Sequence, residues 1–137
     1  MIDLNDFCKK SYDVAKTRQD NGGKINVDPF QMLKHCATEV VEATESFVAY
    51  RKIKNLAEDL TATDIDEKLE SQEEPDVCEN YYQESRKHFI SELADIVSCC
   101  VIIAGKEGFD LEQALNDCYE RNKLRSENKG DKLWKLL

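Results

Sequence analysis

Four carboxylate residues fall into two pairs that are each spaced by about one helical turn. Glu39 and Glu42 form the first pair, and Glu92 and Asp95 form the second. Side chains three residues apart lie about 60° apart around a helix axis and therefore share a face. Like charges so placed repel, by a few tenths of a kcal/mol for an exposed pair. The spacing fits a solvated helix surface, or a site in which a cation compensates the acids.

The surroundings of the two pairs favour a cation. On a helical wheel Glu39 lies at the margin of an apolar stripe, and Glu92 and Asp95 lie beside Cys99 and Ile103. Burying one unpaired charge costs several kcal/mol, so a partly buried group of four carboxylates needs a cation. Oxygen-only ligands favour hard ions such as Mg²⁺ or Mn²⁺. ExxE alone is common on solvated helices, but ExxE followed by ExxD on an apolar helix is more specific.

The two histidines of the chain lie near these acids. His35 and His88 each precede a glutamate, Glu39 or Glu92, by four residues, which puts each histidine on the carboxylate face. A carboxylate-bridged di-iron bundle would instead place the histidine three residues after its glutamate. The order argues against di-iron chemistry. We expect each histidine to donate a hydrogen bond near the site or to be a simple surface residue.

Apolar residues recur every three or four positions in four segments, which predicts four helices that position these groups. The first covers about 4–19 and ends at Asn21-Gly22-Gly23. The second starts at Asp28-Pro29 and ends near residue 54. The third runs from near residue 81 to Gly105 or Gly108, and the fourth is capped by Asp110.

The third segment is apolar on nearly every side between Leu93 and Ala104, which predicts the central, buried helix of the fold. We therefore expect an all-α fold of four or five helices, forming a bundle that dimerisation completes. Residues 1–137 are interpreted as a single domain with a solvated acidic insertion at about 55–80, carrying at most one short helix near 64–72. The apolar cluster of the tail, around Trp134, is expected to dock on a neighbouring chain.

Composition limits the partners of the chain. The net charge of −9 argues against binding a nucleic-acid polymer, because no surplus of basic residues exists to displace counterions from phosphates. A nucleotide substrate stays compatible, since bound cations invert the local charge. Neither a run of eighteen apolar residues nor a signal peptide is visible, so we expect no membrane contact and a cytoplasmic location. The six cysteines are interpreted as reduced, largely buried thiols rather than disulfides or a zinc site.

Three segments resemble one known family. QMLKHCATEVVEATE, at 31–45, resembles the first signature helix of MazG-like and related all-α NTP pyrophosphatases, which carries ExxE and often a third glutamate. FISELADIVSCCV, at 89–101, resembles their second signature, ExxD inside an apolar helix. RNKLR, at 121–125, resembles the basic-and-amide end of their next helix.

The resemblance implies a Mg²⁺-dependent pyrophosphohydrolase that cleaves a nucleoside triphosphate, or a related pyrophosphate, to a monophosphate and pyrophosphate. It also implies a homodimer or homotetramer. The metal ligands would be Glu39, Glu42, Glu92 and Asp95. The phosphate contacts would come from the fourth helix, through Arg121, Asn122, Lys123 and Arg125, and Lys34 is a further candidate. Two features depart from the family pattern, namely a longer spacer between the carboxylate pairs and Cys118 where some relatives have lysine.

Hydrolysis at the α-phosphorus needs a water nucleophile, charge neutralisation and positioning. Mg²⁺ lowers the pKa of its bound water, which leaves a carboxylate to take the proton, and Glu42 and Glu45 are the candidate catalytic bases. No serine–histidine–acid arrangement and no Gly-rich phosphate loop is visible, which argues against covalent or P-loop mechanisms. The alternative function is a helical interaction or regulatory module that keeps the fold without catalysis.

Overall fold

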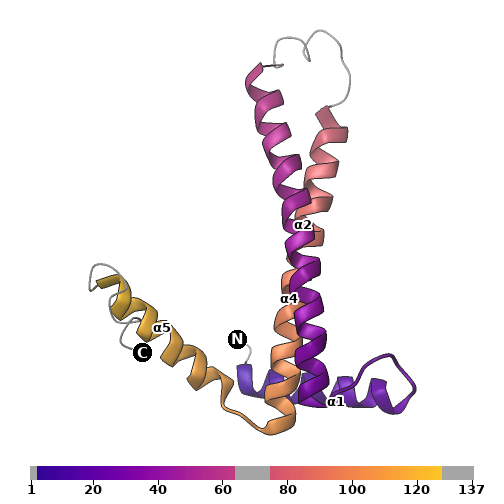
Figure 1. Ribbon diagram of the computed structural model, residues 1–137, viewed down its shortest axis with the longest axis vertical. Coiled ribbons are helices and arrows are strands. Elements are labelled where there is room, and N and C mark those ends of the chain that lie inside the picture. The colour runs from indigo at the N-terminus through magenta and orange to yellow at the C-terminus, as the bar shows by residue number, and fades with distance from the viewer. Residues whose placement is uncertain (1–2, 64–74, 128–137) are drawn as a thin grey trace. The chain divides into compact units, whose positions relative to one another are not determined.

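The computed structural model describes residues 3–63 and 75–127, and every regular element in these ranges is an α-helix (Figure 1). The helices are α1 (Leu4–Asp20), α2 (Pro29–Thr63), α4 (Pro75–Glu107) and α5 (Leu111–Glu127). The expected all-α class is therefore confirmed. The chain divides into two compact units, and the division falls within α4: one unit is Phe30–Cys100, and the other combines Met1–Pro29 with Val101–Leu137.

The helices begin and end where local chemistry predicts. The Asp3 side chain accepts a hydrogen bond from the Asp6 amide and caps α1, and Asn21 is the C-cap, followed by Gly22 with a φ of 82°. That left-handed conformation is one that glycine adopts at low cost. Asp110 Oδ1 accepts a hydrogen bond from the Gln113 amide at 3.0 Å, so the predicted cap of α5 is confirmed.

Two predicted boundaries are wrong. α2 continues past residue 54 to Thr63, and α4 begins at Pro75 rather than near residue 81. Glutamates such as Glu58 suggested a solvated insertion but are also good helix formers, and residues 55–63 hold no glycine or proline. Proline is well suited to a first helical position. The predicted short helix at 64–72 and the tail at 128–137 lie outside the described residues.

The unit that contains α1 and α5 packs around a small cluster. Cys8, Val101 and Ala104 are buried together, and Leu4 and Leu111 pack against them. These side chains bring α1 and the first turn of α5 against the C-terminal end of α4.

A close backbone approach accompanies this cluster. Gly105 of α4 lies so near α1 that an added Cβ would overlap the carbonyl oxygen of Cys8 and would come within 2.9 Å of the Tyr12 Cβ. Nearby, the Asn5 amide donates to Asp110 Oδ1 at 2.8 Å, and Asn5 Oδ1 accepts from the Glu112 amide at 3.2 Å. Glycine is therefore required at 105 for α1 to pack as it does.

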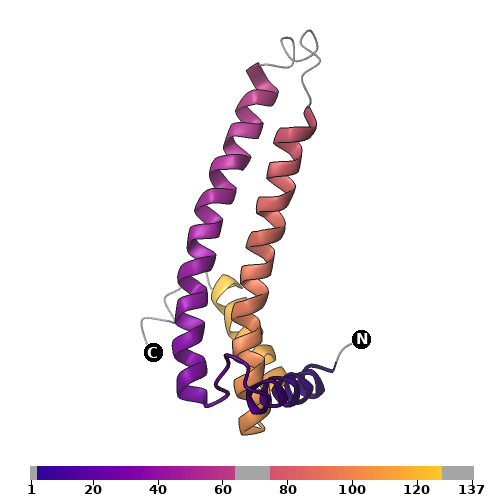
Figure 2. The ribbon, with the colours of Figure 1, turned by 90° about the vertical axis from the view of Figure 1, so that its right-hand side faces the viewer.

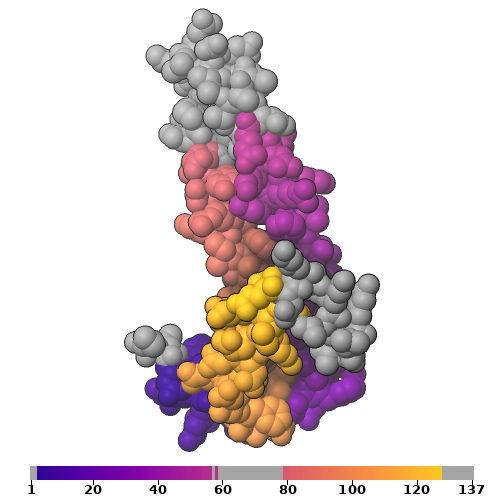
Figure 3. All heavy atoms as spheres, turned by 90° about the vertical axis from the view of Figure 1, so that its left-hand side faces the viewer, coloured from indigo at the N-terminus to yellow at the C-terminus, as the bar shows by residue number. Residues whose placement is uncertain are grey.

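The other unit is an antiparallel hairpin made by α2 and the greater part of α4, which lie side by side in both ribbon views (Figures 1 and 2). Aromatic contacts join the two helices: the ring centroids of Phe47 and Phe89 are 5.1 Å apart, and the hydroxyl oxygens of Tyr50 and Tyr82 are 3.3 Å apart. Where both helices are visible in Figure 3, their atoms are in contact. These contacts set the register between the helices.

The hairpin leaves one apolar side uncovered. Val40 directly follows Glu39 and Leu93 directly follows Glu92, so each is rotated by about 100° from its glutamate. Because the helices run in opposite directions, equal rotations bring residues to the same side of the pair. Six large apolar side chains on this side are at least 40% exposed, and we call them the lateral apolar face. They are Leu33, Val40, Phe47, Ile90, Leu93 and Val97.

This exposure corrects the expectation that the third helix is buried on nearly every side. Ile90, Leu93 and Val97 of α4 are 49%, 45% and 57% exposed in the single chain. The apolar composition of α4 therefore exceeds what the described part of one chain covers.

By length and composition, the part of α4 from Glu79 to Glu107 would also suffice to cross a membrane. This is weak evidence, because the core helix of a soluble protein meets the same criterion. Glu92 and Asp95 lie within this stretch, where charged groups would be costly in lipid. The expected absence of membrane contact and the cytoplasmic location stay predictions.

Candidate metal centre

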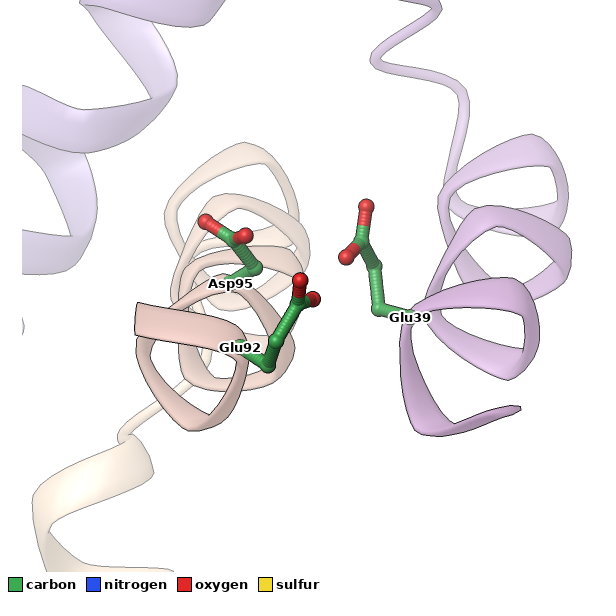
Figure 4. A group of neighbouring side chains, drawn as sticks. All are labelled: Glu39, Glu92 and Asp95. Atoms are coloured by element: carbon green, nitrogen blue, oxygen red, sulfur yellow. The ribbon is translucent and has the colours of Figure 1, made fainter. Parts of the chain in front are cut away.

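Three of the four predicted ligands converge inside the hairpin. Glu39 extends from α2 toward Glu92 and Asp95, which extend from α4 (Figure 4). One carboxylate oxygen of each residue lies within 4.8 Å of the corresponding oxygen of the other two. A single cation placed among these oxygens could therefore contact all three carboxylates after small side-chain adjustments. We call these three residues the acidic triad.

Two residues of the triad are largely shielded from water, and the third is not. The exposed fraction of the Glu39 side chain is 11%, and that of the Glu92 side chain is 12%, whereas Asp95 is exposed. Oε2 of Glu39 and Oε2 of Glu92 are buried and have no hydrogen-bond partner in the described part of the chain. Buried polar atoms are normally satisfied, so two orphaned carboxylate oxygens side by side call for a ligand.

The remaining oxygens of the two glutamates face the histidines. His35 Nε2 lies 3.0 Å from Glu39 Oε1, and His88 Nε2 lies 3.4 Å from Glu92 Oε1. The prediction that each histidine shares a face with its glutamate is confirmed. An imidazole N–H that donates to one oxygen of a carboxylate orients it and leaves the second oxygen for a cation, as outer-shell partners of metal ligands do.

The electrostatics of the triad are those of mutually repelling acids. The pKa of Glu39 is raised, first by burial and next by the negative charge of Glu42; the carboxylates of Asp95 and Glu92 act in the same direction, and His35 opposes them. Each raising cause disfavours the ionised carboxylate, and each would be offset by a nearby positive charge. Either a proton or a cation therefore stabilises this arrangement.

The candidate bases lie outside the triad. Glu42 is exposed, although it is close enough to Glu39 for its charge to raise the pKa of that residue. Glu45 is exposed and lies six residues from Glu39, which is about 240° around α2. Lys34 is also exposed, and its Nζ lies 4.6 Å from the ring centroid of Phe30.

The other predicted phosphate contacts lie on α5, in the unit that contains α1. Arg121, Asn122 and Lys123 are exposed and Arg125 is half-buried. The Asn122 amide approaches the Cys118 sulfur at 3.8 Å. The role of these α5 side chains in binding phosphate stays a prediction.

One feature beside the triad was not foreseen. Burial raises the pKa of the Cys99 and Cys100 thiols, neighbouring Cys36 acts in the same direction on both, and the charge of Glu39 adds to the effect on Cys99. The signal in the sequence is that Cys36 precedes Glu39 by three residues and Cys99 follows Asp95 by four. In antiparallel helices these offsets put the cysteines at about the same level of the hairpin, about one turn from the triad.

Comparisons with known proteins add no identification. No protein family matches the chain, no curated protein matches it, and no solved structure matches it. The chemistry therefore depends on the site itself. The acidic triad offers only carboxylate oxygens, with no sulfur and no imidazole nitrogen among its three ligands.

Proposed function

We propose that this chain is a Mg²⁺-dependent pyrophosphohydrolase of the MazG-like kind, which converts a nucleoside triphosphate or related pyrophosphate to a monophosphate and pyrophosphate. The observation that carries the proposal is the acidic triad, with the two orphaned oxygens of Glu39 and Glu92. Three carboxylates, two of which have an unsatisfied oxygen, are the kind of donor set that Mg²⁺ or Mn²⁺ prefers. The intact order of ExxE and ExxD agrees with the same reading.

The triad would hold the cation, which when bound neutralises phosphate charge and makes a water molecule more acidic. Among the candidate bases, Glu42 is favoured over Glu45. Glu42 lies close enough to perturb Glu39, whereas Glu45 lies on another side of α2. Glu42 is exposed and can reach a water molecule at the edge of the triad without a desolvation cost. His35 and His88 would keep the two buried glutamates oriented.

A nucleotide carrying several negative charges needs basic partners as well as a cation. The residues proposed for this are Lys34, Arg121, Asn122, Lys123 and Arg125. Lys34 belongs to the hairpin and the others belong to α5. We further propose that the active form is a homodimer or homotetramer, because the lateral apolar face is exposed in the single chain.

The same exposed face favours a second candidate, a helical interaction module without catalysis. Exposed contiguous apolar surface is typical of protein contacts. The two candidates differ in what they require of the triad, since an interaction module has no use for buried, unsatisfied carboxylates. Their presence favours the hydrolase.

The test is a screen of canonical and modified ribo- and deoxynucleoside triphosphates with Mg²⁺ or Mn²⁺, in which released pyrophosphate is measured. We expect turnover of at least one compound, dependent on the cation and lost in Asp95→Asn. Glu84→Gln is the matched control, because Glu84 is an exposed acid of α4 outside the triad. Absence of pyrophosphate release across the screen, with both cations, would favour the interaction module.

A further inference from the structure

One asparagine of the chain stands at an open turn. Asn21 is the C-cap of α1 and is followed directly by Gly22. Both residues are exposed, and apart from the chain neighbours no heavy atom lies within 4 Å of the position that a Cβ of Gly22 would take. Among the described residues, the Asn21 side-chain amide has no hydrogen-bond partner. It is therefore free to turn toward the backbone nitrogen of Gly22, and no side chain stands in the way.

The other described asparagines are held more firmly. Asn26 lies in the same loop, but its Oδ1 accepts a hydrogen bond from the Asp28 amide at 3.0 Å. The residue after it, Val27, is buried and β-branched, and its amide donates to Gln19 Oε1 at 2.8 Å. Five asparagines lie within helices and precede residues that carry side chains, namely Asn5, Asn55, Asn80, Asn116 and Asn122.

One hydrogen bond restrains the Gly22 nitrogen. Its amide donates to the carbonyl oxygen of Gln19 at 3.0 Å, in the turn that ends α1. The terminal turn of a helix opens locally at a small fraction of the free energy of global unfolding. Opening of this one turn releases the nitrogen while the rest of α1 stays folded.

We propose that Asn21 is a site of spontaneous modification, at which its side-chain amide is converted to a carboxylate through a cyclic imide formed with Gly22. The co-reactant is water. The site lies at the end of α1, outside the hairpin that carries the acidic triad, so the proposal is independent of the proposed hydrolase activity.

The reaction has two steps and involves no change of oxidation state. Hydroxide removes the amide proton of Gly22, and the nitrogen attacks Cγ of Asn21. The bond from Cγ to the side-chain nitrogen then breaks, and that nitrogen leaves as ammonia after taking up a proton. Water next opens the imide. Cleavage between Cγ and the Gly22 nitrogen gives aspartate, whereas cleavage between the Asn21 carbonyl carbon and that nitrogen gives isoaspartate; either way the nitrogen regains its proton.

Both products weaken the end of α1. Each puts a negative charge at the C-terminus of the helix, where the backbone carbonyls already present negative partial charge. Isoaspartate also lengthens the main chain by the Cβ atom. That displaces the Gly22 amide from the Gln19 carbonyl and the Gly23 amide from the Arg18 carbonyl, which it now meets at 2.8 Å.

The test incubates the full folded chain at neutral and at mildly alkaline pH, followed by rapid, mildly acidic digestion after lysine and arginine and by peptide mass mapping. The peptide 19–24 contains Asn21 as its one asparagine, and the peptide 25–34 contains Asn26 as its one. We expect 19–24 to gain the mass difference between NH2 and OH, to separate into aspartate and isoaspartate forms, and to convert faster at the higher pH. The peptide 25–34 should stay unchanged.

Matched variants decide the assignment. Asn21→Gln should abolish the conversion of 19–24, because glutamine would have to close a larger ring, whereas Asn26→Gln should leave that conversion intact. Asn21→Asp carries the charge without the longer main chain, so the converted protein should unfold at a lower midpoint than this variant. Conversion of Asn21 in denaturant only, or conversion of Asn26 at an equal rate in the folded chain, would overturn the proposal.

Discussion

Replacing Glu39 with glutamine removes one charge from the acidic triad while it keeps the shape of the side chain. Glu39 is 8% exposed, its Oε2 has no hydrogen-bond partner among the described residues, and its carboxylate lies beside those of Glu92 and Asp95. An unsatisfied buried group costs about 1–3 kcal/mol. We expect Glu39→Gln to raise the free energy of unfolding of the cation-free protein by about 1 kcal/mol, the lower end of that range, because the amide still needs partners. For a domain of this size that is a rise of about 4 °C in the unfolding midpoint.

A bound cation should reverse the relative stability of the variant and the natural chain. A cation that binds only the folded state stabilises it by about 2.7 kcal/mol at a hundred times its Kd. Glu39→Gln removes a charged ligand and should lose most of that gain. The variant is therefore expected to be more stable than the natural chain without cation and less stable with it, a crossover that a general packing defect cannot produce.

The pH dependence of the cation-free stability provides an independent test of the role of Glu39. The pKa of Glu39 is raised in the folded protein from its ordinary value of 4.5, so the folded state binds this proton more tightly than the unfolded state. The destabilising contribution of Glu39 is fully present above the raised pKa and is lost as the pH falls toward 4.5. Cation-free stability should therefore gain this contribution on acidification, and Glu39→Gln should remove it.

The assay is thermal unfolding followed by circular dichroism, in chelator and in millimolar Mg²⁺ with a non-hydrolysable substrate analogue. Glu45→Gln is the matched control, because Glu45 is an exposed acid of the same helix outside the triad. A variant that is destabilised in chelator, or that keeps the full Mg²⁺-induced shift, would refute the reasoning.

Three further outcomes follow from the same structure. Asp95→Asn should lower turnover by about 100-fold or more while the helix content stays intact, as measured by pyrophosphate release and circular dichroism; retained activity would mean the ligand assignment is wrong. Gly105→Ala should lower the free energy of unfolding by about 1–3 kcal/mol, because the added Cβ overlaps the Cys8 carbonyl oxygen; an unchanged denaturant midpoint would contradict this. Sedimentation at low micromolar concentration should show a dimer or tetramer, and Leu93→Lys or Val97→Lys on the lateral apolar face should shift it toward monomer without unfolding; a monomeric natural chain with full activity would exclude the assembly.

The helix ends were predictable where a local interaction decides them. The Asp110 cap and the Asn21-Gly22 stop depend on neighbours within a few residues, and both were found as predicted. The end of α2 was not, because acidic residues such as Glu58 suggest solvation and are also compatible with a long helix. Charge density alone does not distinguish a solvated loop from the exposed end of a helical hairpin.

The acidic triad was predictable only in part, for a related reason. Spacing within a helix shows that Glu92 and Asp95 share a face, but it cannot show which acids of α2 stand opposite them. That choice depends on the register of the hairpin, which distant aromatic contacts such as Phe47 with Phe89 set. The register places Glu39 opposite Glu92 and Asp95 and leaves Glu42 at the edge of the acidic triad. It also brings Cys36 near enough to Cys99 to contribute, after burial, to the raised pKa of that thiol.

The apolar residues of α4 show most clearly what a sequence pattern leaves undetermined. Glu92 and Cys99 point to one side of the helix, where α2 covers them, while Leu93 and Val97 occupy another side that stays exposed in the described chain. A helix with two apolar sides needs two surfaces to cover it. The periodicity of the sequence shows that both sides must be covered, but not which surface covers each. The lateral apolar face is built from both helices, with Val40 from α2 and Leu93 from α4. One added surface could therefore cover both residues. The proposed assembly therefore needs a single flat contact along the hairpin rather than a separate partner for each helix.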